Sequence, residues 1–319
     1  MRLLNFGSIN IDYVYRVDHF LKAGETLEAA DRTIFMGGKG LNQSVAAVRS
    51  GLTVAHCGVL GADGHFLSDF MKETGIDVRF LKIDESAATG HTVIQVTPEA
   101  ENAILYFAGT NHALTHEHIK NALDDLDEGD MVLMQNEVNG VEEILREAKK
   151  RNLFTVFNPA PYCPAVLSYP LECVDALIVN ETEAQGILGQ NEIEPERLLL
   201  GLRKRFDKAL IFLTLGKGGM SCSLPQSPQH CYHFKAYSVS AVDTTGAGDT
   251  FVGYALKAIM DYSVRKDLAS FLHLIDEAML AAAMSVTRRG AVASIPTLEE
   301  LSEFKAKKID CYGKEKDHY

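Results

Sequence analysis

The chain has 319 residues, of which 46% are hydrophobic and 23% charged, a composition typical of globular enzymes. A chain of this length can bury a large apolar core, so it needs neither disulfides nor a structural metal for stability. The formal net charge is -12 and the sequence has no dense run of Lys or Arg, which argues against a nucleic-acid-binding protein.

Cysteine usage and the N-terminus indicate where such a protein works. Six cysteines are scattered singly without a CxxC pair, which predicts free thiols in a cytoplasmic protein. The first expected strand begins almost at Met1, so we expect no signal peptide, and no apolar run of membrane-spanning length. His112, His116 and His118 lie in a polar segment, where we expect exposed side chains rather than metal ligands.

Short β-rich runs alternate with amphipathic helical stretches along most of the chain. This alternation predicts an α/β fold in which one mostly parallel sheet carries helices on both faces, in a single domain of residues 1–319. Val141–Arg151 and Pro195–Arg205 are expected helices. The expected strands are Leu3–Phe6, Val54–Val59, Met131–Gln135, Phe154–Asn158, Ala176–Asn180 and Ala209–Leu215.

Two regions break this rhythm and predict a small second sheet. The strict alternation of Ile9–Val17 places Asn10 and Asp12 on one face of a strand and apolar residues on the other. The runs His91–Val96 and Ala103–Phe107 predict a hairpin. We therefore expect an accessory β-sheet, formed by about residues 9–36 and 88–108, that projects from the main sheet.

The sharpest chemical signal is the run Ala241–Thr250, which precedes an expected helix, Phe251–Met260. Glycines at the start of a helix let successive backbone N–H groups converge on an anion, aided by the helix dipole. The carboxylate of Asp249 in the same turn could take a proton from a hydroxyl that attacks a phosphoryl group. The alternative is that Asp249 only caps the helix.

A second glycine motif, Gly37–Gln43, leads into an expected helix, Leu41–Ser50. Its glycines permit a close approach of backbone to a ligand, and Lys39 and Asn42 are suited to sugar hydroxyls. The spacing is not that of a Walker A loop. The alternative is a tight turn before a helix.

Two further motifs follow expected strands. Asn180 and Glu183 come directly after an apolar strand, where they could orient Mg²⁺ and its waters or simply form a capping box. The run Leu213–Gly219 could cradle a nucleotide or form a glycine-rich turn. Each motif is weak alone, and together they favour a phosphate-handling enzyme.

In order and spacing these motifs resemble the phosphofructokinase-B type carbohydrate kinase family, and within it the ribokinase group. The resemblance spans nearly the whole chain, from Gly7 to Pro296, and includes Asn158–Pro161 and Val286–Ala291 as well as the motifs above. It implies a ribokinase-like three-layer α/β fold in which the small β-sheet is a lid.

The resemblance also implies roles for individual residues. The sugar-binding residues are expected to be Asn10, Asp12, Gly38, Lys39, Asn42 and Glu137. Asp249 corresponds to the catalytic base, with Gly246, Ala247 and Gly248 as the anion hole. The expected nucleotide-binding residues are Asn180, Glu183, Thr214, Gly216, Gly219 and Gly248, with Glu183 acting indirectly on Mg²⁺. A monovalent-cation site is expected at Asp243, Thr245, Arg288, Gly290 and Ser294, largely through backbone carbonyls.

The expected reaction is phosphoryl transfer from ATP to the 5-hydroxyl of D-ribose, with Mg²⁺ and K⁺, by a cytoplasmic homodimer that binds neither nucleic acid nor membranes. The dimer is expected through the lid, because the strand face that carries Ile9, Ile11, Tyr13 and Tyr15 needs cover. One alternative is a kinase of another small sugar or a nucleoside, and another is a catalytically silent sugar-binding regulator. A nicotinamide dehydrogenase is disfavoured, since no GxGxxG follows the first strand.

Overall fold

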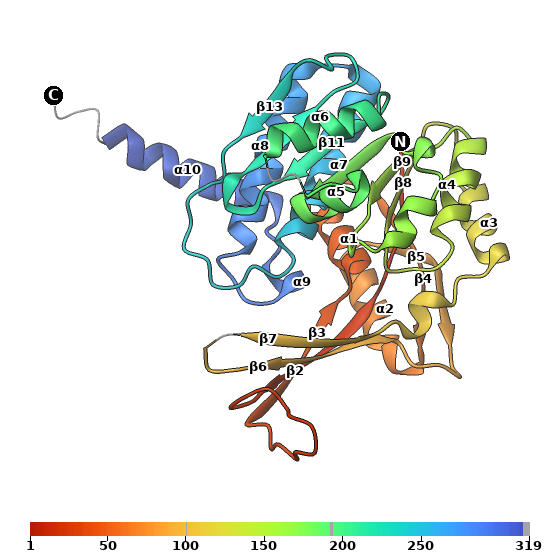
Figure 1. Ribbon diagram of the computed structural model, residues 1–319, viewed down its shortest axis with the longest axis vertical. Coiled ribbons are helices and arrows are strands. Elements are labelled where there is room, and N and C mark those ends of the chain that lie inside the picture. The colour runs from red at the N-terminus through yellow and green to blue at the C-terminus, as the bar shows by residue number, and fades with distance from the viewer. Residues whose placement is uncertain (100, 192–193, 315–319) are drawn as a thin grey trace.

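The main body of the protein is built on a nine-stranded sheet in the order β13-β12-β11-β10-β9-β8-β1-β4-β5 (Figure 1). The computed structural model describes residues 1–99, 101–191 and 194–314, with side chains up to residue 306. All pairings from β11 to β5 are parallel, and only β12 and β13 join antiparallel. The strands are β1 Leu3–Phe6, β4 Val54–Gly61, β5 Asp77–Asp84, β8 Met131–Gln135, β9 Phe154–Asn158, β10 Ala176–Asn180, β11 Leu210–Thr214, β12 Met220–Ser223 and β13 Cys231–Phe234.

Helices cover both faces of this sheet, which gives the three-layer arrangement that the alternating pattern predicts. One face packs against α1 Lys39–Arg49, α2 His65–Glu73, α7 Ala247–Arg265 and α8 Leu268–Ser285. The other packs against α3 His116–Asp124, α4 Val141–Lys150, α5 Glu181–Leu188 and α6 Pro195–Arg205. The short α9 Ala291–Ser294 and the C-terminal α10 Leu298–Lys314 follow α8.

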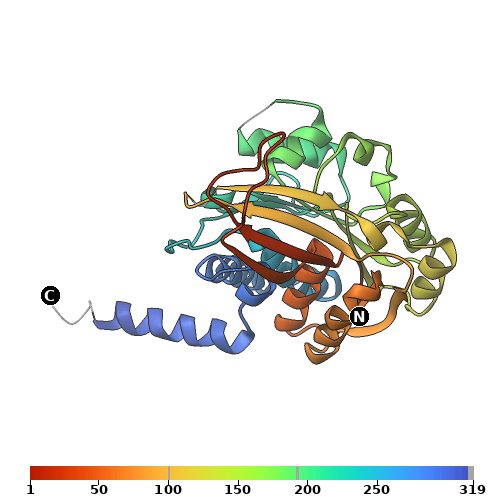
Figure 2. The same cartoon turned by 90° about the horizontal axis from the view of Figure 1, so that it is seen from below.

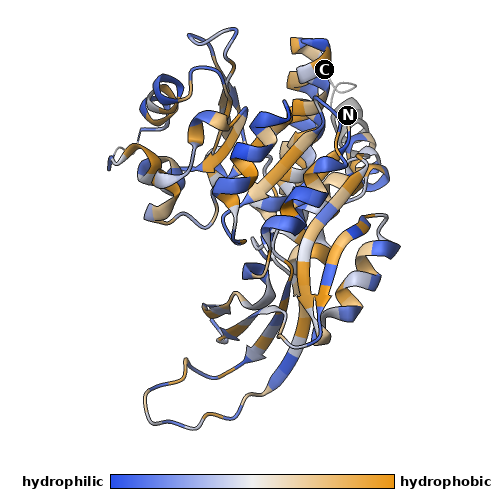
Figure 3. Ribbon diagram, turned by 90° about the vertical axis from the view of Figure 1, so that its right-hand side faces the viewer, coloured by the Kyte–Doolittle hydropathy of each residue, from blue (hydrophilic) through white to orange (hydrophobic). Residues whose placement is uncertain are grey.

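Successive residues of each central strand belong to opposite cores, because side chains alternate across a sheet. Leu3 and Leu133 pack in the core under α1 and α7, whereas Leu4 and Met134 pack in the core under α3 and α4. Strands that are buried on both faces read as continuous apolar runs. Figure 3 shows this pattern as apolar strands between helices whose outer faces are polar.

The small sheet has four strands in the order β3-β2-β6-β7. They are β2 Asn10–Arg16, β3 Asp31–Gly37, β6 Gly90–Val96 and β7 Asn102–Phe107. The chain passes from β1 to β2 through residues 7–9 alone, so the small sheet follows directly on an interior strand of the large one. Figure 1 shows it extending away from the main body, and in Figure 2, which looks from below, its strands lie in front of that body.

The structure corrects three expectations from the sequence. Ile9 and Ile11 are buried in the main core, so the exposed apolar surface of the small sheet lies instead on β7 and at Ile34. His118 is buried, with Nε2 at 2.8 Å from the carbonyl of Phe80. By length and composition α8 could cross a membrane. It packs along α7 and contributes Phe271 to the core, which is the ordinary reason for an apolar helix in a large domain.

Helices α1 and α7, which both carry predicted site residues, pack closely against each other, and this contact depends on a glycine. A Cβ built on Gly253 would lie 2.3 Å from Cβ of Ala46, 2.7 Å from N of Ala47 and 2.7 Å from the carbonyl oxygen of Gln43. Two of these atoms are backbone, so they can yield only if the whole helix moves. The absence of a side chain at Gly253 therefore sets the distance between α1 and α7.

We predict that Gly253→Ala destabilises the protein although alanine is the better helix former. Overpacking costs about 1–3 kcal/mol, against a helix-propensity gain of about 1 kcal/mol. The expected net effect is a loss of up to about 2 kcal/mol, seen as a lower Tm in calorimetry. Gly201→Ala in α6 is the control, because its Cβ would meet only the flexible end of Leu188. A Tm for Gly253→Ala equal to or above that of Gly201→Ala would contradict this account.

Candidate active site

The predicted site residues gather where the parallel strands of the large sheet end. The strands on the two sides of β1 are connected in opposite directions, so a crevice is expected at their carboxyl ends. The structure has a cleft of about 250 Å³ there. It is lined by Lys39, Asn158, Ala160, Ile178, Val179, Asn180, Glu183, Thr214, Thr244, Gly246, Gly248, Asp249 and Val252.

Asp249 lies in the first turn of α7, and its carboxylate faces α1. Its Oδ2 accepts a hydrogen bond from Nδ2 of Asn42 at 2.8 Å, and its Oδ1 accepts one from Nε2 of Gln43 at 2.9 Å. The side chain is 8% exposed, so one edge of the carboxylate reaches the cleft. The N-cap of α7 is Gly246, without a side-chain capping bond. Asp249 is therefore not the N-cap residue of α7, although it lies in the first turn of this helix.

The turn before Asp249 leaves room for an anion. Gly246 has φ 76°, a left-handed conformation that favours glycine. The first bond of the helix runs from the N–H of Thr250 to the carbonyl of Gly246 at 2.8 Å, and amides before such a bond point along the helix axis. A Cβ at Gly248 would meet nothing within 4 Å. The N–H of Ala247 makes a long bond, 3.4 Å, to the carbonyl of Thr244, and the open space beside Gly248 leaves room for an anion at the start of α7.

Asn10 and Asp12 lie on one face of β2, as the alternation predicts, and each is held by a neighbour. Nδ2 of Asn111 donates to Oδ1 of Asn10 at 2.7 Å, which leaves the NH₂ group of Asn10 for a ligand. Thr92 donates to Oδ1 of Asp12 at 2.6 Å. Burial raises the pKa of Asp12, and the hydrogen bond from Thr92 opposes this effect.

Lys39 is the cation of the site and lies among three carboxylates. Asp249 contributes most to raising its pKa, against the opposing effect of burial, and Glu137 and Glu183 add to the rise. Glu137 accepts hydrogen bonds from the Ser8 hydroxyl and, at 3.2 Å, from the backbone N–H of Lys39. Burial raises the pKa of Glu137, whereas Lys39 opposes it. Lys39 therefore lies within electrostatic reach of Glu137 on one side and of Asp249 and Glu183 on the other.

Asn180 and Glu183 form a complete capping box at the start of α5. Oδ1 of Asn180 accepts from the N–H of Glu183 at 2.9 Å, and Oε2 of Glu183 accepts from the N–H of Asn180 at 2.9 Å. The capping box that the sequence analysis gave as the alternative for this motif is therefore present. It does not preclude a second role, because both residues also line the cleft and a carboxylate oxygen keeps a lone pair for a metal-bound water. Burial raises the pKa of Glu183.

The glycine-rich turn after β11 is only partly in the site. Thr214 lines the cleft and is in register with Asn180 on β10. Gly216 and Gly219 are not among the residues that line it. A Cβ on Gly219 would lie 2.0 Å from the carbonyl oxygen of Phe234. The close approach of β13 therefore accounts for a glycine at this position.

The residues expected around a monovalent cation come from two loops that meet beside the start of α7. Oδ1 and Oδ2 of Asp243 accept the N–H groups of Thr245 at 3.0 Å and Gly290 at 2.9 Å, which ties the loops together. The guanidinium of Arg288 pairs with Glu300 at 2.8 Å, and the hydroxyl of Ser294 donates to the carbonyl of Ala291. Since these side chains are engaged, any cation here would be held mainly by backbone carbonyls.

Four further residues hold predicted site residues in place but were not themselves predicted as site residues: Ser8, Gln43, Thr92 and Asn111. Each is polar and buried, and each bonds a predicted site residue across the fold. Their partners lie 80 to 206 residues away in sequence. Only Gln43 had a local signal, because it stands next to Asn42 within the glycine motif.

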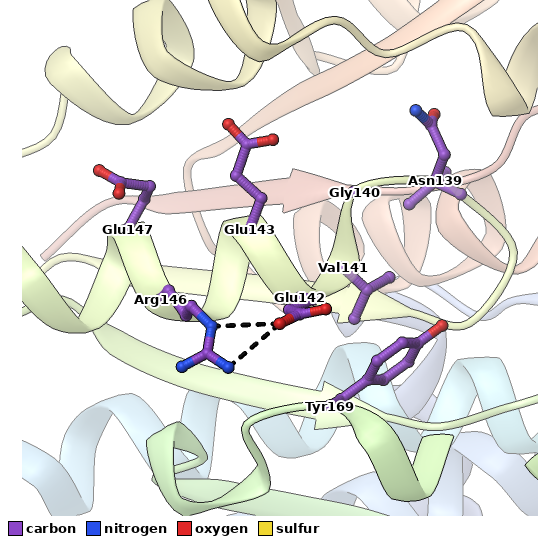
Figure 4. A pocket seen from close by; sticks show the side chains of 9 residues that line it. Asn139, Gly140, Val141, Glu142, Glu143, Arg146, Glu147 and Tyr169 are labelled. Carbon is purple, nitrogen blue, oxygen red and sulfur yellow. Dashed lines mark hydrogen bonds and ion pairs between the residues drawn. The ribbon is translucent and has the colours of Figure 1, made fainter. Parts of the chain in front are cut away.

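A larger cleft of about 520 Å³ lies elsewhere, at the start of α4 (Figure 4). It is lined by Val138, Asn139, Gly140, Val141, Glu142, Glu143, Arg146, Glu147 and Tyr169. Its carboxylates are engaged by neighbouring basic side chains, since Arg146 binds Glu142 at 3.1 Å, His116 contacts Glu143, and Glu147 pairs with Lys150 and Arg151. No predicted site residue lines it, so the smaller cleft is the candidate active site.

Comparison with known proteins gives a consistent result. The model of the pfkB family carbohydrate kinases matches residues 2–298. The chain is 35% identical over 305 residues to a ribokinase of Haemophilus influenzae, covering 93% of this chain and 96% of that one. It is 30% identical over 317 residues to a deoxyribokinase of Salmonella typhi, covering 95% and 98%. The crystal structure of a Cryptococcus neoformans ribokinase in complex with ADP superposes with a TM-score of 0.80 at 31% identity, covering 95% and 99%.

Proposed function

The chain belongs to the pfkB family of carbohydrate kinases and is an ATP-dependent sugar kinase, and we propose that its reaction is the transfer of the γ-phosphoryl group of ATP to the 5-hydroxyl of D-ribose. The observation that carries this proposal is the position of Asp249, whose buried carboxylate is held by α1 at the mouth of the anion-binding turn of α7. Residues 1–319 would act as one cytoplasmic kinase unit, with the small sheet as its lid.

In this mechanism Asp249 accepts the proton of the sugar hydroxyl as the oxygen attacks the γ-phosphorus. A new O–P bond forms, the bond from the γ-phosphorus to the bridging oxygen breaks, and ADP leaves with that electron pair. The amides of Gly246, Ala247 and Gly248 would stabilise the charge on the phosphoryl oxygens. The ammonium of Lys39 lies in the same cleft and adds positive charge. The lid would exclude water from the reacting group.

Two metal ions fit the donors that the chain offers. Asn180 and Glu183 would hold the waters of Mg²⁺, which neutralises phosphate charge when it is bound. Asp243, Thr245, Arg288, Gly290 and Ser294 would hold K⁺, because neutral carbonyl oxygens suit a large ion of single charge. Among the described residues no cluster of three or more His, Cys, Asp or Glu side chains could hold a metal ion.

Free ribose is favoured as substrate by the polar groups that remain available. Asn10 offers its NH₂ group, and Oδ1 of Asn42 is buried without a partner among the described residues. Asp12 and Glu137 add carboxylates that accept hydrogen bonds from hydroxyls. We place the nucleotide against Asn180, Thr214 and the start of α7, with Gly216 and Gly219 behind it. A hydroxyl-rich sugar satisfies this set better than a nucleobase would.

A panel of acceptors with MgATP tests the substrate, read as ADP release and product mass. We expect the highest kcat/KM with D-ribose, lower values with 2-deoxy-D-ribose and D-fructose, and little turnover of adenosine.

Asp249→Asn should lower kcat about 10²–10⁴-fold, because an amide cannot accept the hydroxyl proton. Its fold should survive, since Asn42 can turn its amide and offer its unpaired Oδ1 to the new NH₂ group.

The same panel separates the competing functions. A preference for adenosine would replace ribose by a nucleoside within the same chemistry. No turnover of any acceptor, with tight sugar binding by calorimetry, would indicate a silent regulator. If Asp249→Asn keeps more than about a tenth of kcat with an unchanged Tm, then Asp249 is not the essential base.

Potassium should raise kcat several-fold over lithium at equal ionic strength. A large ion matches a set of backbone carbonyls better than a small, strongly hydrated one. It would act by ordering the turn before Asp249, so the KM for ribose should change little. Equal rates with potassium and with tetramethylammonium would show that no specific cation site is used.

The protein should form a homodimer through the lid. The edge strand β7 exposes Ile104, Leu105 and Phe107, at 58%, 70% and 53% of their surface. Exposed apolar edge strands attract further strands. We expect sedimentation velocity at micromolar concentration to give a dimer, and Leu105→Asp to give a monomer. Leu167→Asp is the matched control, since Leu167 is exposed on a different part of the surface. A monomeric wild-type protein would contradict the proposal.

A further inference from the structure

We infer that Gln43 is a positioning residue for Asp249, and that a chain of buried amides beneath the cleft fixes which way Gln43 faces. The inference rests on the proposed function of Asp249 as the base and adds a residue that acts through it. It starts from an observation that the mechanism does not use: below Asp249 lie four buried amide side chains, Gln43 on α1 and, on three strands of the large sheet, Asn5, Gln135 and Asn158. Their hydrogen bonds form one connected network.

One end of this network is anchored by a backbone carbonyl. Nδ2 of Asn158, the last residue of β9, donates to the carbonyl of Ile178 on β10 at 2.9 Å. A carbonyl can only accept, so the NH₂ group of Asn158 must face Ile178 and its Oδ1 must face Gln43. Nε2 of Gln43 donates to that oxygen at 3.0 Å.

The other end is anchored in the same way. Nδ2 of Asn5 on β1 donates to the carbonyl of Gly40 at 2.8 Å and to the hydroxyl of Ser44 at 2.9 Å. The oxygen of Asn5 therefore faces Gln135, whose Nε2 donates to it at 3.0 Å. The second N–H of the same group donates to Oε1 of Gln43 at 2.8 Å.

Both anchored ends of the network require the same orientation of the Gln43 amide. Its oxygen receives Gln135, and its nitrogen serves Asn158 and Oδ1 of Asp249. Turning Gln43 would set its oxygen against two acceptors, and turning Gln135 would do the same. The present arrangement leaves unpaired only Oε1 of Gln135, a smaller cost than two facing acceptors. Asp249 is thus always offered an N–H donor by Gln43.

This donor has a consequence for the reaction rather than for binding. It holds one oxygen of Asp249 inside the protein, so the carboxylate cannot rotate away from the cleft. The charged groups around Asp249 are Lys39, Glu137 and Glu183, from three other segments of the chain. Without Gln43, only Asn42 would still hold the carboxylate, which could then turn about that single bond toward Lys39, away from a sugar hydroxyl. Gln43 does not line the cleft, so its loss should not directly affect the binding of either substrate.

The test is a double-mutant cycle with Gln43→Met and Asp249→Asn, with kcat and both KM values measured for ribose and MgATP. We expect Gln43→Met to lower kcat about tenfold, the usual effect of one lost hydrogen bond to a charged group. Both KM values should stay within about twofold. In the Asp249→Asn background the same substitution should change the residual kcat less than about twofold, because it acts through Asp249. If Gln43→Met does not fold, Gln43→Ala, which removes the amide without adding an acceptor or a charge, replaces it in the cycle.

Ser44→Ala is the matched control, since Ser44 is the next residue on α1 and belongs to the same network at the end away from Asp249, where it contacts His56 at 2.8 Å. It should lower Tm and leave kcat unchanged. An unchanged kcat in Gln43→Met, or an equal loss in both backgrounds, overturns the positioning role. High activity of Asp249→Asn alone would instead overturn the assignment of the base, so the two failures can be told apart.

Discussion

The contact between α1 and α7 determines the geometry of the whole site. It brings Asn42 and Gln43 to within 2.9 Å of the carboxylate of Asp249, across more than 200 residues of sequence. The contact is possible because Gly253 has no side chain where α7 passes the backbone of α1. A second close approach, between Gly7 and Gly40, leaves no room for a Cβ on either residue. Together these two contacts seat the start of α1 against the end of β1 and against α7.

Buried polar side chains fix the orientation of the site residues, which apolar packing alone would not do. Leucine and valine fill the two cores, but they do not specify the direction of a neighbouring carboxylate. The amides below the cleft are satisfied almost completely, and a satisfied network is rigid and directional. Asn111 does the same for Asn10 on the lid side, with its own oxygen fixed by the N–H of Ile9 at 2.9 Å. Two of the polar groups left free, the NH₂ group of Asn10 and Oδ1 of Asn42, belong to predicted sugar-binding residues.

Much of the fold could be predicted from the sequence because its signals are local. The strands Leu3–Phe6, Met131–Gln135 and Phe154–Asn158 are apolar runs that end at polar residues, and the structure places all three as predicted. The period of two in β2 put Asn10 and Asp12 on one face for the same reason. The predicted family, the kinase chemistry and the three-layer fold are confirmed by the comparisons.

What could not be predicted depends on tertiary contacts. The expected helix Phe251–Met260 begins at Ala247, because the turn glycines belong to its first turn rather than to a loop. Ile9 and Ile11 seemed to need a partner subunit, but the main core covers them. Gln135 and Asn5 meet Gln43 only after the strands are ordered side by side. No pattern in one sequence indicates which of its many amides will do so.

The central claim is that Asp249 receives the proton of a sugar hydroxyl at the start of α7. A crystal structure with ribose, ADP and aluminium fluoride as a mimic of the transferred phosphoryl group tests it most directly. We predict that the 5-hydroxyl oxygen lies at hydrogen-bond distance, about 2.6–3.2 Å, from a carboxylate oxygen of Asp249. The fluoride ligands should face the amides of Gly246–Gly248. A sugar bound with its 5-hydroxyl beyond reach of Asp249, or a phosphoryl mimic away from that turn, would contradict the account.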